Sequence, residues 1–241
     1  MKGLNGRRVL ITGAAGGIGA AVAQRLAAEG AIVAGADLVK PELNKTLAFA
    51  GAMDVCNASD TARLVSEVNE TLGGIDAVVA VAGIQASGPT HELSEDVFRK
   101  VLDVNVLGTF LTTRAVIPQM LEQGYGTILT FGSTAAVCGA PELAAYAAAK
   151  GAILQYTRSI AVEYASRGIR ANCICPGGTM TPLLRQLNAE RSEPDHFAAK
   201  HPIGRYAEPD EIAAAATFLL SDDASFVLGS AMLVDGGFSA S

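Results

Sequence analysis

The chain has 241 residues, half of them apolar, and a formal net charge of −6. This apolar share excludes intrinsic disorder, and the acidic balance argues against nucleic acid and anionic membranes as partners, because both need a basic face. No apolar run reaches the roughly eighteen residues that cross a bilayer, and the N-terminus leads straight into a strand-like segment. We therefore expect a cytoplasmic protein with one large core that binds neither nucleic acid nor membrane.

Short apolar or β-branched runs alternate along the chain with longer segments of helical period. The predicted strands are Arg8–Thr12, Ala31–Ala36, Phe49–Met53, Asp76–Ala82, Gly126–Ser133, Arg170–Cys175 and Ala231–Val234. The predicted helices are Gly17–Glu29, Asp60–Leu72, Glu95–Leu121, Leu143–Arg167 and Pro209–Leu220. Several strands are apolar throughout, as strands covered on both faces are. The alternation predicts an α/β fold, doubly wound around a mostly parallel seven-stranded sheet with helices on both faces.

No repeat, linker or low-complexity tract divides this pattern, so we expect a single domain over residues 1–241. The segment from 39 to 48 contains Pro41 and has only a weak pattern. The connection between the second and third strands is therefore expected to be abbreviated, without a full helix.

A glycine-rich turn follows the first predicted strand and opens the first predicted helix. It reads Thr-Gly-Ala-Ala-Gly-Gly-Ile-Gly over residues 12–19. Glycine lets the backbone approach a pyrophosphate closely, and a helix N-terminus supplies free N–H donors and a partial positive charge. A tight strand-to-helix corner also needs glycine for steric reasons, so the turn alone does not establish a nucleotide site.

Asp37 ends the second predicted strand, 18 residues after Gly19. This is close to the spacing at which a carboxylate meets an adenosine ribose. A carboxylate there accepts hydrogen bonds from the ribose hydroxyls and repels a 2′-phosphate, and the neighbouring residues offer no cation for such a phosphate. The sequence therefore predicts NAD in preference to NADP, with a loop-capping role for Asp37 as the alternative.

Tyr146 and Lys150 lie four residues apart on a predicted helix, and Ser133 precedes Tyr146 by thirteen residues at a strand end. Side chains four apart share one helix face, so the phenol and the ammonium project into the same space. A cation close to a phenol in a dry site lowers the pKa of the tyrosine from its ordinary value of about 10. A serine hydroxyl there can bind and orient a substrate oxygen.

The four cysteines, Cys56, Cys138, Cys173 and Cys175, show no C-x-x-C spacing. Cys173 and Cys175 are two apart on a predicted strand, so their side chains point the same way. We expect buried free thiols. The three histidines include no H-E-x-x-H pair and no partner at ligand spacing, so no metal site is predicted.

These motifs, in this order, resemble those of the short-chain dehydrogenase/reductase family, in its compact single-domain branch, over essentially the whole chain. The resemblance rests on the glycine turn, Asp54-Val55, Ala82-Gly83, Asn105, Ser133, the Tyr-x-x-x-Lys pair and Pro176-Gly177. It implies a single-domain Rossmann fold and an NAD(H)-dependent oxidoreductase that interconverts a secondary alcohol and a ketone. Where the family has Asn-Asn-Ala-Gly, this chain has Ala-Val-Ala-Gly at 80–83. The difference affects a hydrogen bond within the sheet and leaves the chemistry in place.

The resemblance also implies a role for each site residue. Tyr146 would be the general acid/base and Ser133 would polarise the substrate oxygen. Lys150 would lower the pKa of the tyrosine and contact the nicotinamide ribose, and Asn105 would hold a water in a proton relay to Lys150. Asn105 has an alternative interpretation as a helix-interior polar group bonded to a neighbouring strand. The implied cofactor-binding residues, besides Tyr146 and Lys150, are Gly13, Gly17, Ile18, Gly19, Asp37, Asp54, Val55, Ala82, Gly83, Pro176, Gly177, Thr179 and Thr181.

Residues 183–205 lie between a strand end and the next helix and are expected to form a substrate lid. The predicted pocket wall is mostly apolar: Gln85, Thr134, Val137, Cys138, Leu143 and the stretch 179–201. A carboxylate substrate would need a cation from the lid, although such charges are more often solvated. The candidate cations are Arg185, Arg191, Lys200 and Arg205. The sequence does not select a particular small-molecule alcohol or ketone.

Two other functions stay open. One is a non-catalytic NAD-binding regulator on the same fold, against which the intact Ser133, Tyr146 and Lys150 weigh; the other is an NADPH-type 3-oxoacyl thioester reductase. An epimerase or dehydratase on an extended scaffold is disfavoured, because too little chain follows Pro176. The resemblance implies a homotetramer, and the alanine-rich helix 143–167 carries apolar stripes that would suit one. Packing within the chain explains those stripes equally well.

Overall fold

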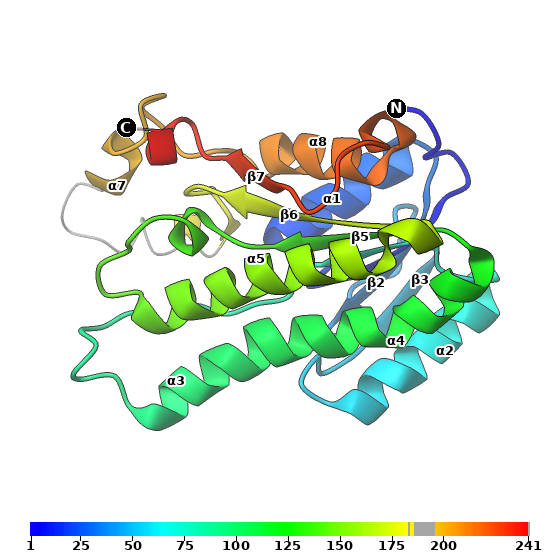
Figure 1. Ribbon diagram of the computed structural model, residues 1–241, viewed down its shortest axis with the longest axis horizontal. Coiled ribbons are helices and arrows are strands. Elements are labelled where there is room, and N and C mark those ends of the chain that lie inside the picture. Colours follow the sequence, from blue (N-terminus) through cyan, green and yellow to red (C-terminus); the bar gives the residue numbers. More distant parts are fainter. Residues whose placement is uncertain (183, 186–195, 241) are drawn as a thin grey trace.

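The structure, a computed structural model, describes residues 1–182, 184–185 and 196–240 (Figure 1). Its strands form one sheet in the order β3-β2-β1-β4-β5-β6-β7, and every neighbouring pair is parallel. The strands are β1 (Arg8–Thr12), β2 (Ile32–Asp37), β3 (Phe49–Ala52), β4 (Ala77–Ala80), β5 (Gly126–Phe131), β6 (Ile169–Pro176) and β7 (Ala231–Val234). The predicted doubly wound α/β fold is confirmed, and the sheet is wholly parallel where the sequence predicted a mostly parallel one.

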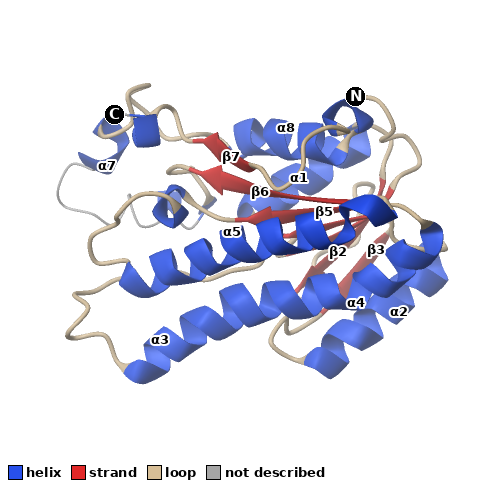
Figure 2. Cartoon of the chain, in the orientation of Figure 1, coloured by secondary structure: helices blue, strands red, loops and turns tan. Residues whose placement is uncertain are grey.

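Helices lie on both faces of this sheet (Figure 2). The described helices are α1 (Gly17–Ala28), α2 (Ala58–Leu72), α3 (Glu95–Leu102), α4 (Gly108–Gln123), α5 (Ala144–Tyr164), α7 (His196–Ala199) and α8 (Pro209–Leu220). Helices α1 and α8 pack on one face, and α2, α4 and α5 pack on the other. The described stretch between β2 and β3 contains no helix, as its weak pattern predicted.

The strands are apolar throughout because each face of the sheet has its own core. In β1, Val9 and Ile11 belong to the core beneath α1 and α8, whereas Leu10 belongs to the core beneath α2, α4 and α5. All three side chains are fully buried. Successive side chains on a strand point to opposite faces, so a strand between two helical layers buries every residue.

Three predicted strands are longer than the observed ones, and one of them, Phe49–Met53, exceeds β3 (Phe49–Ala52) by a single residue. The prediction Asp76–Ala82 corresponds to β4 (Ala77–Ala80), and the prediction Gly126–Ser133 corresponds to β5 (Gly126–Phe131). Val81 and Ala82 stay partly buried against the two cores although they have left the sheet. An apolar run therefore marks burial, and it does not mark where the hydrogen-bonded ladder ends.

The predicted helix Glu95–Leu121 is divided by a π-helical turn, Asp103–Leu107, which joins α3 to α4. At its centre the side-chain amide of Asn105 donates to the carbonyl of Val101 at 2.9 Å. In a regular α-helix this carbonyl, four residues earlier, would accept the backbone N–H of Asn105. Here the side-chain amide of Asn105 donates to it instead. One extra residue in a turn is invisible to hydrophobic periodicity, although π-turns occur often at functional sites.

The stretch Glu95–Gln123 is long and apolar enough to cross a membrane by length and composition, and half of its most apolar window is buried inside the protein. Core helices of soluble proteins pass the same test, so this stretch is weak evidence for a membrane span. In this fold it packs against α2 and α5 and faces the sheet.

The topology brings the motif-bearing strand ends to one edge of the sheet. In a parallel sheet all carboxyl ends meet at the same edge, and the strand order reverses between β1 and β4. The glycine turn follows β1, Ser133 follows β5, and the loop that begins at Gly177 follows β6. Ligands of open α/β sheets bind at this reversal point.

Candidate active site

The glycine turn is shaped by contacts that only glycine allows. Gly13 has a φ of 75°, and a Cβ atom there would lie 2.8 Å from the backbone nitrogen of Ala82. A Cβ atom at Gly19 would overlap the carbonyl oxygen of Gly13. The N-cap of α1 is Gly16, and no side chain caps this helix end. The steric explanation of the turn is therefore correct, and the same turn leaves N–H groups at the start of α1 open to an anion.

The loop after β6 meets this turn. A Cβ atom at Gly17 would lie 3.3 Å from the side-chain methyl of Thr181. The loop is held by Met180, whose N–H donates to the carbonyl of Ala207 at 2.8 Å, and by Thr179, whose hydroxyl donates to the carbonyl of Gly177 at 3.1 Å. Two segments about 160 residues apart in sequence, both predicted to bind cofactor, thus lie together.

Asp37 lies against the glycine turn. Its carboxylate accepts the N–H of Ala15 at 3.0 Å and the N–H of Leu38 at 2.7 Å. These bonds are the loop-capping role that the sequence left open. Each carboxylate oxygen has a second lone pair, so the cap and a ribose-binding role are compatible.

The remaining predicted adenosine residues follow β3. Asp54 is exposed and helps to line an open pocket of about 470 Å³, while Val55 is buried against Gly108 at the start of α4. The other residues that line the pocket are Leu38, Cys56, Asp96, Arg99, Lys100, Asp103 and Val104. Asp54 and Leu38 therefore share one pocket although they follow different strands.

Ser133, Tyr146 and Lys150 come together at the end of β5. The Nζ atom of Lys150 donates to the carbonyl of Phe131 at 2.9 Å and lies 5.5 Å from the centre of the Tyr146 ring. The hydroxyl of Ser133 accepts the N–H of Ala135 at 3.1 Å and lies close enough to Tyr146 to lower the pKa of its phenol. The strand end and one face of α5 thus bring the three predicted catalytic side chains together.

Burial shifts the pKa values of Lys150 and Tyr146. It lowers the pKa of Lys150 from 10.5 to about 8, because the ammonium is almost fully removed from water. It also raises the pKa of Tyr146, an effect that the hydrogen bond with Ser133 opposes. In the chain by itself the pKa of Tyr146 lies above its ordinary value, because loss of hydration penalises the phenolate more than Ser133 stabilises it. That Lys150 lowers this pKa in the complex with cofactor stays a prediction.

Asn105 has one buried atom without a partner. Its amide group donates to the carbonyls of Ile84 and Val101, at 2.8 and 2.9 Å, but its Oδ1 atom accepts no hydrogen bond. A Cβ atom at Gly83 would lie 2.5 Å from this oxygen and 3.5 Å from the Nζ atom of Lys150. The bond to Ile84, just beyond β4, agrees with the alternative interpretation of Asn105. Its free acceptor, however, lies on the side of Gly83 and Lys150, where the resemblance places a relay.

The predicted lid cations are engaged in other contacts where they are described. Arg185 pairs with Glu208 at 2.6 Å, and Arg205 pairs with Glu211 at 2.7 Å. Lys200 lies 6.0 Å from the centre of the Phe197 ring. Arg191, like residues 183, 186–190 and 192–195 of the predicted lid, lies outside the described residues.

Cys173 and Cys175 are fully buried on the same side of β6, where they pack with Ile153 and Leu154 of α5. The prediction of free thiols is confirmed for all four cysteines, and the prediction of burial is confirmed for this pair, but Cys56 and Cys138 are only half-buried. Over the residues that the structure describes, no three His, Cys, Asp or Glu side chains gather as a metal site would require.

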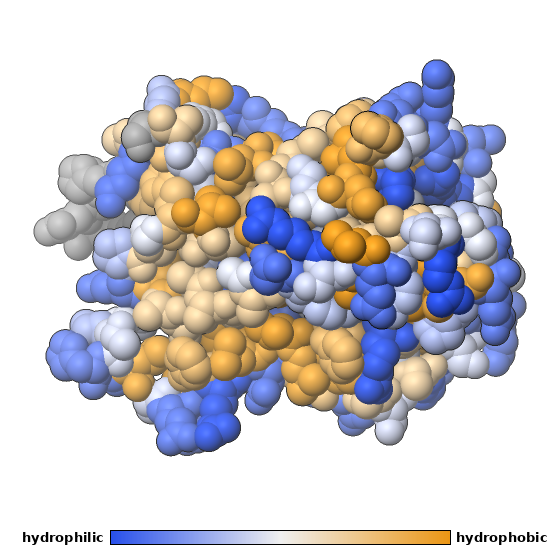
Figure 3. All heavy atoms as spheres, viewed as in Figure 1, coloured by the Kyte–Doolittle hydropathy of each residue, from blue (hydrophilic) through white to orange (hydrophobic). Residues whose placement is uncertain are grey.

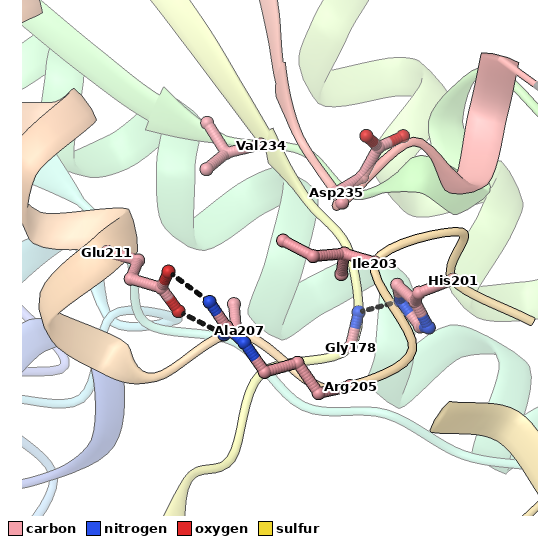
Figure 4. Close-up of a pocket in the computed structure, with 9 residues that line it drawn as sticks. Gly178, His201, Ile203, Arg205, Ala207, Glu211, Val234 and Asp235 are labelled. Atoms are coloured by element: carbon pink, nitrogen blue, oxygen red, sulfur yellow. Dashed lines mark hydrogen bonds and ion pairs between the residues drawn. The ribbon is translucent and has the colours of Figure 1, made fainter. Parts of the chain in front are cut away.

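His201 is the last residue of the predicted pocket-lining stretch, and no motif in the sequence assigns it a further role. In the structure it is 2% exposed, and its ring accepts a hydrogen bond from the backbone N–H of Gly178 in the loop after β6 (Figure 4). The two residues are 23 positions apart, and no spacing rule connects them. The doubled glycine at 177–178 is the one local signal, since it marks a backbone that something approaches closely.

A glycine turn at the reversal point of a parallel sheet, with a serine, a tyrosine and a lysine gathered beside it, defines the class of a dinucleotide-binding oxidoreductase with a Rossmann fold. A family model described as "Enoyl-(Acyl carrier protein) reductase" matches residues 13–239. The chain belongs to the short-chain dehydrogenase/reductase family.

Individual relatives are similar over nearly the whole chain. The 2-(S)-hydroxypropyl-CoM dehydrogenase 3 of Xanthobacter autotrophicus is 41% identical, with 96% of each chain covered. The 2,5-dichloro-2,5-cyclohexadiene-1,4-diol dehydrogenase of Sphingobium indicum is 39% identical over the full length of both. Among solved structures, 3-ketoacyl-(acyl-carrier-protein) reductase from Brucella melitensis, complexed with NADH, has a TM-score of 0.91 and 34% identity, covering 98% of this chain and 99% of the other.

Proposed function

We propose that this chain is an NAD(H)-dependent dehydrogenase that interconverts a secondary alcohol and a ketone. The observation that carries the proposal is the gathering of Ser133, Tyr146 and Lys150 beside the glycine turn. Relatives named as dehydrogenases of a hydroxypropyl compound, a cyclic diol and glucose support an alcohol as substrate. The substrate class is a small molecule with a hydroxyl or carbonyl group.

The residues fit a nicotinamide dinucleotide. Open N–H donors at the start of α1 suit its pyrophosphate, which Gly13, Gly17, Ile18 and Gly19 would approach. Asp37 would take the adenosine ribose and Asp54-Val55 the adenine. The nicotinamide end would lie against Ala82, Gly83, Tyr146, Lys150, Pro176, Gly177, Thr179 and Thr181. When bound, the cofactor accepts or donates the hydride.

The chain itself supplies the proton chemistry. In the oxidative direction the phenolate oxygen of Tyr146 takes the hydroxyl proton of the alcohol, and in the reductive direction the phenol returns it to the carbonyl oxygen. Ser133 donates a hydrogen bond to that substrate oxygen and stabilises its developing charge. A buried phenolate needs a nearby positive charge, and Lys150 supplies one. The Oδ1 atom of Asn105 accepts from a water that carries protons to Lys150.

The assay that tests this proposal follows absorbance at 340 nm with NAD and a panel of secondary alcohols, and with NADH and the corresponding ketones. We expect turnover with at least one pair. Cofactor binding without turnover on any substrate would contradict the proposal and support a non-catalytic regulator. A 3-oxoacyl thioester reductase is the second candidate, favoured by the structural likeness to a 3-ketoacyl-(acyl-carrier-protein) reductase. Reduction of an acetoacetyl thioester as the fastest reaction would favour that candidate.

The preference for NAD is proposed to rest on Asp37. We expect Asp37→Ala to raise the kcat/KM ratio of NADP to NAD by about tenfold or more, because it removes a negative charge from the position of the 2′-phosphate. The matched control is Glu70→Ala, an exposed carboxylate on α2 that changes the net charge equally. Both ratios come from initial rates with the same alcohol. A wild-type enzyme that already prefers NADP would overturn the assignment.

We also propose a cytoplasmic, single-domain homotetramer with residues 183–205 as its substrate lid and no nucleic-acid or membrane partner. Apolar side chains gather over α4 and α5 on one face of the molecule (Figure 3). Val162 of α5 is 79% exposed and Phe110 of α4 is 37% exposed. Burial of such a face between copies would remove this apolar area from water.

A further inference from the structure

His201 has one hydrogen-bond partner at each ring nitrogen. Its Nε2 atom accepts the backbone N–H of Gly178 at 3.0 Å (Figure 4). Its Nδ1 atom lies 3.1 Å from the carbonyl oxygen of Phe197. An N–H only donates and a carbonyl only accepts, so this geometry fits the tautomer that carries its proton on Nδ1. The ring is 2% exposed, so water does not replace either partner.

Aromatic rings from three segments surround the imidazole. Phe197 of α7 lies edge-on to it at 5.2 Å between ring centres, Tyr206 lies at 5.8 Å, and Phe238 near the end of the described chain lies at 5.2 Å. Packed rings at these separations leave little freedom of rotation. The Nε2 atom is therefore a fixed acceptor.

The backbone at Gly177 and Gly178 packs closely against His201 and its neighbours. A Cβ atom at Gly177 would lie 3.0 Å from Nε2 of His201 and 2.9 Å from the Cα atom of Asp235, and one at Gly178 would overlap the ring of Tyr206. The N–H of Gly177 also donates to the carbonyl of Val234 at 3.0 Å. The loop after β6 is thus clamped at two successive peptide groups, one by β7 and one by His201.

The clamp lies directly before the residues that meet the glycine turn. Thr179 follows Gly178, and the side chain of Thr181 lies against Gly17. Rotation of the Gly178 peptide would displace these two threonines, because backbone direction is transmitted through fixed bond geometry.

We propose that His201 is a positioning residue that, through the Gly178 N–H, sets the conformation of the loop from Pro176 to Thr181 for cofactor binding. The inference rests on the proposed function, which gives this loop its cofactor. Neither the family resemblance nor the motif spacing assigns His201 this positioning role.

Charged side chains also lie beside the ring. Arg205, Glu211 and Asp235 line, together with His201, a cavity of about 70 Å³.

The test compares His201→Gln with His201→Asn. The glutamine amide oxygen reaches the position of Nε2 and can accept from Gly178, whereas the asparagine amide can replace only the Nδ1 contact with Phe197. Both variants lose the ring and each keeps one of its two contacts, so their comparison weighs the Gly178 bond against the Phe197 contact. His91→Gln, at a histidine side chain that is 81% exposed, is the control. The readouts are the Kd of NADH by fluorescence, the KM for NAD against kcat, and thermal unfolding.

We expect His201→Asn to raise the Kd of NADH by about tenfold with little change in kcat, and His201→Gln to stay within about threefold of wild type. Equal Kd values for the two variants, at any level of stability, would overturn the positioning role while leaving the proposed function intact. A wild-type protein that binds no NADH would overturn both.

Discussion

Replacing Tyr146 by Phe is expected to lower kcat by about 10²–10⁴-fold while changing the Kd of NADH by less than about threefold. The variant keeps the ring and its packing on α5 and removes only the oxygen that carries the proton. Hydride transfer without proton transfer leaves a charged oxygen on the substrate, which a site with one hydroxyl donor, Ser133, stabilises poorly.

Tyr156→Phe is the matched control for this experiment. Tyr156 lies on the same helix, is also half-buried, and is hydrogen-bonded through its hydroxyl to Thr113 at 2.7 Å. Loss of that bond is expected to cost about 1 kcal/mol of unfolding free energy and leave kcat unchanged. Steady-state rates and urea unfolding measure both quantities. Full turnover in Tyr146→Phe would end the proposed mechanism.

Replacing Lys150 by Met is expected to abolish most turnover, by about 10²-fold or more, without loss of stability at pH 7. The ammonium is 5% exposed, and burial lowers its pKa from 10.5 to about 8. This difference corresponds to about 3 kcal/mol against the charged form in the folded state. The substitution leaves the carbonyl of Phe131 without its donor, at a cost of about 1–3 kcal/mol. The variant should therefore be as stable as the wild type or more stable by up to about 2 kcal/mol.

The pH dependence has a definite sign. The folded protein releases the Lys150 proton near pH 8, and the unfolded chain releases it near 10.5. Between these values the unfolded state binds more protons, so the stability of the wild type rises relative to the variant as the pH increases. Urea unfolding at pH 7 and at pH 10 measures this change, with Lys45→Met, at an exposed loop lysine, as control. A stability difference that does not vary with pH would show that burial does not lower the pKa of Lys150 in the folded protein.

The sequence by itself determined the features that depend on neighbours along the chain. Val9, Leu10 and Ile11 predicted a strand covered on both faces, because every residue of such a strand is apolar. The four-residue spacing of Tyr146 and Lys150 placed both on one helix face, because the helical repeat is 3.6 residues. The glycine turn and Asp37 indicated a dinucleotide by spacing alone, and the structure places them in contact.

The tertiary structure decided what depends on partners distant in sequence. The π-turn at Asn105 adds one residue to a turn, and its unpartnered oxygen is seen only once Gly83 lies beside it. The pKa of Tyr146 follows the number of atoms packed around the phenol, so the lysine one turn away was not enough to predict its direction.

The contacts of the loop after β6 also depend on residues that are distant in sequence. The meeting of Thr181 with Gly17 and the bond between His201 and Gly178 join segments that local pattern does not relate. Periodicity reports which face of an element is buried, whereas the identity of the atoms that meet it is set by how the elements pack. The fold and the gathering of Ser133, Tyr146 and Lys150 could therefore be predicted from the sequence, whereas the positions and proton affinities of their atoms depend on the packing.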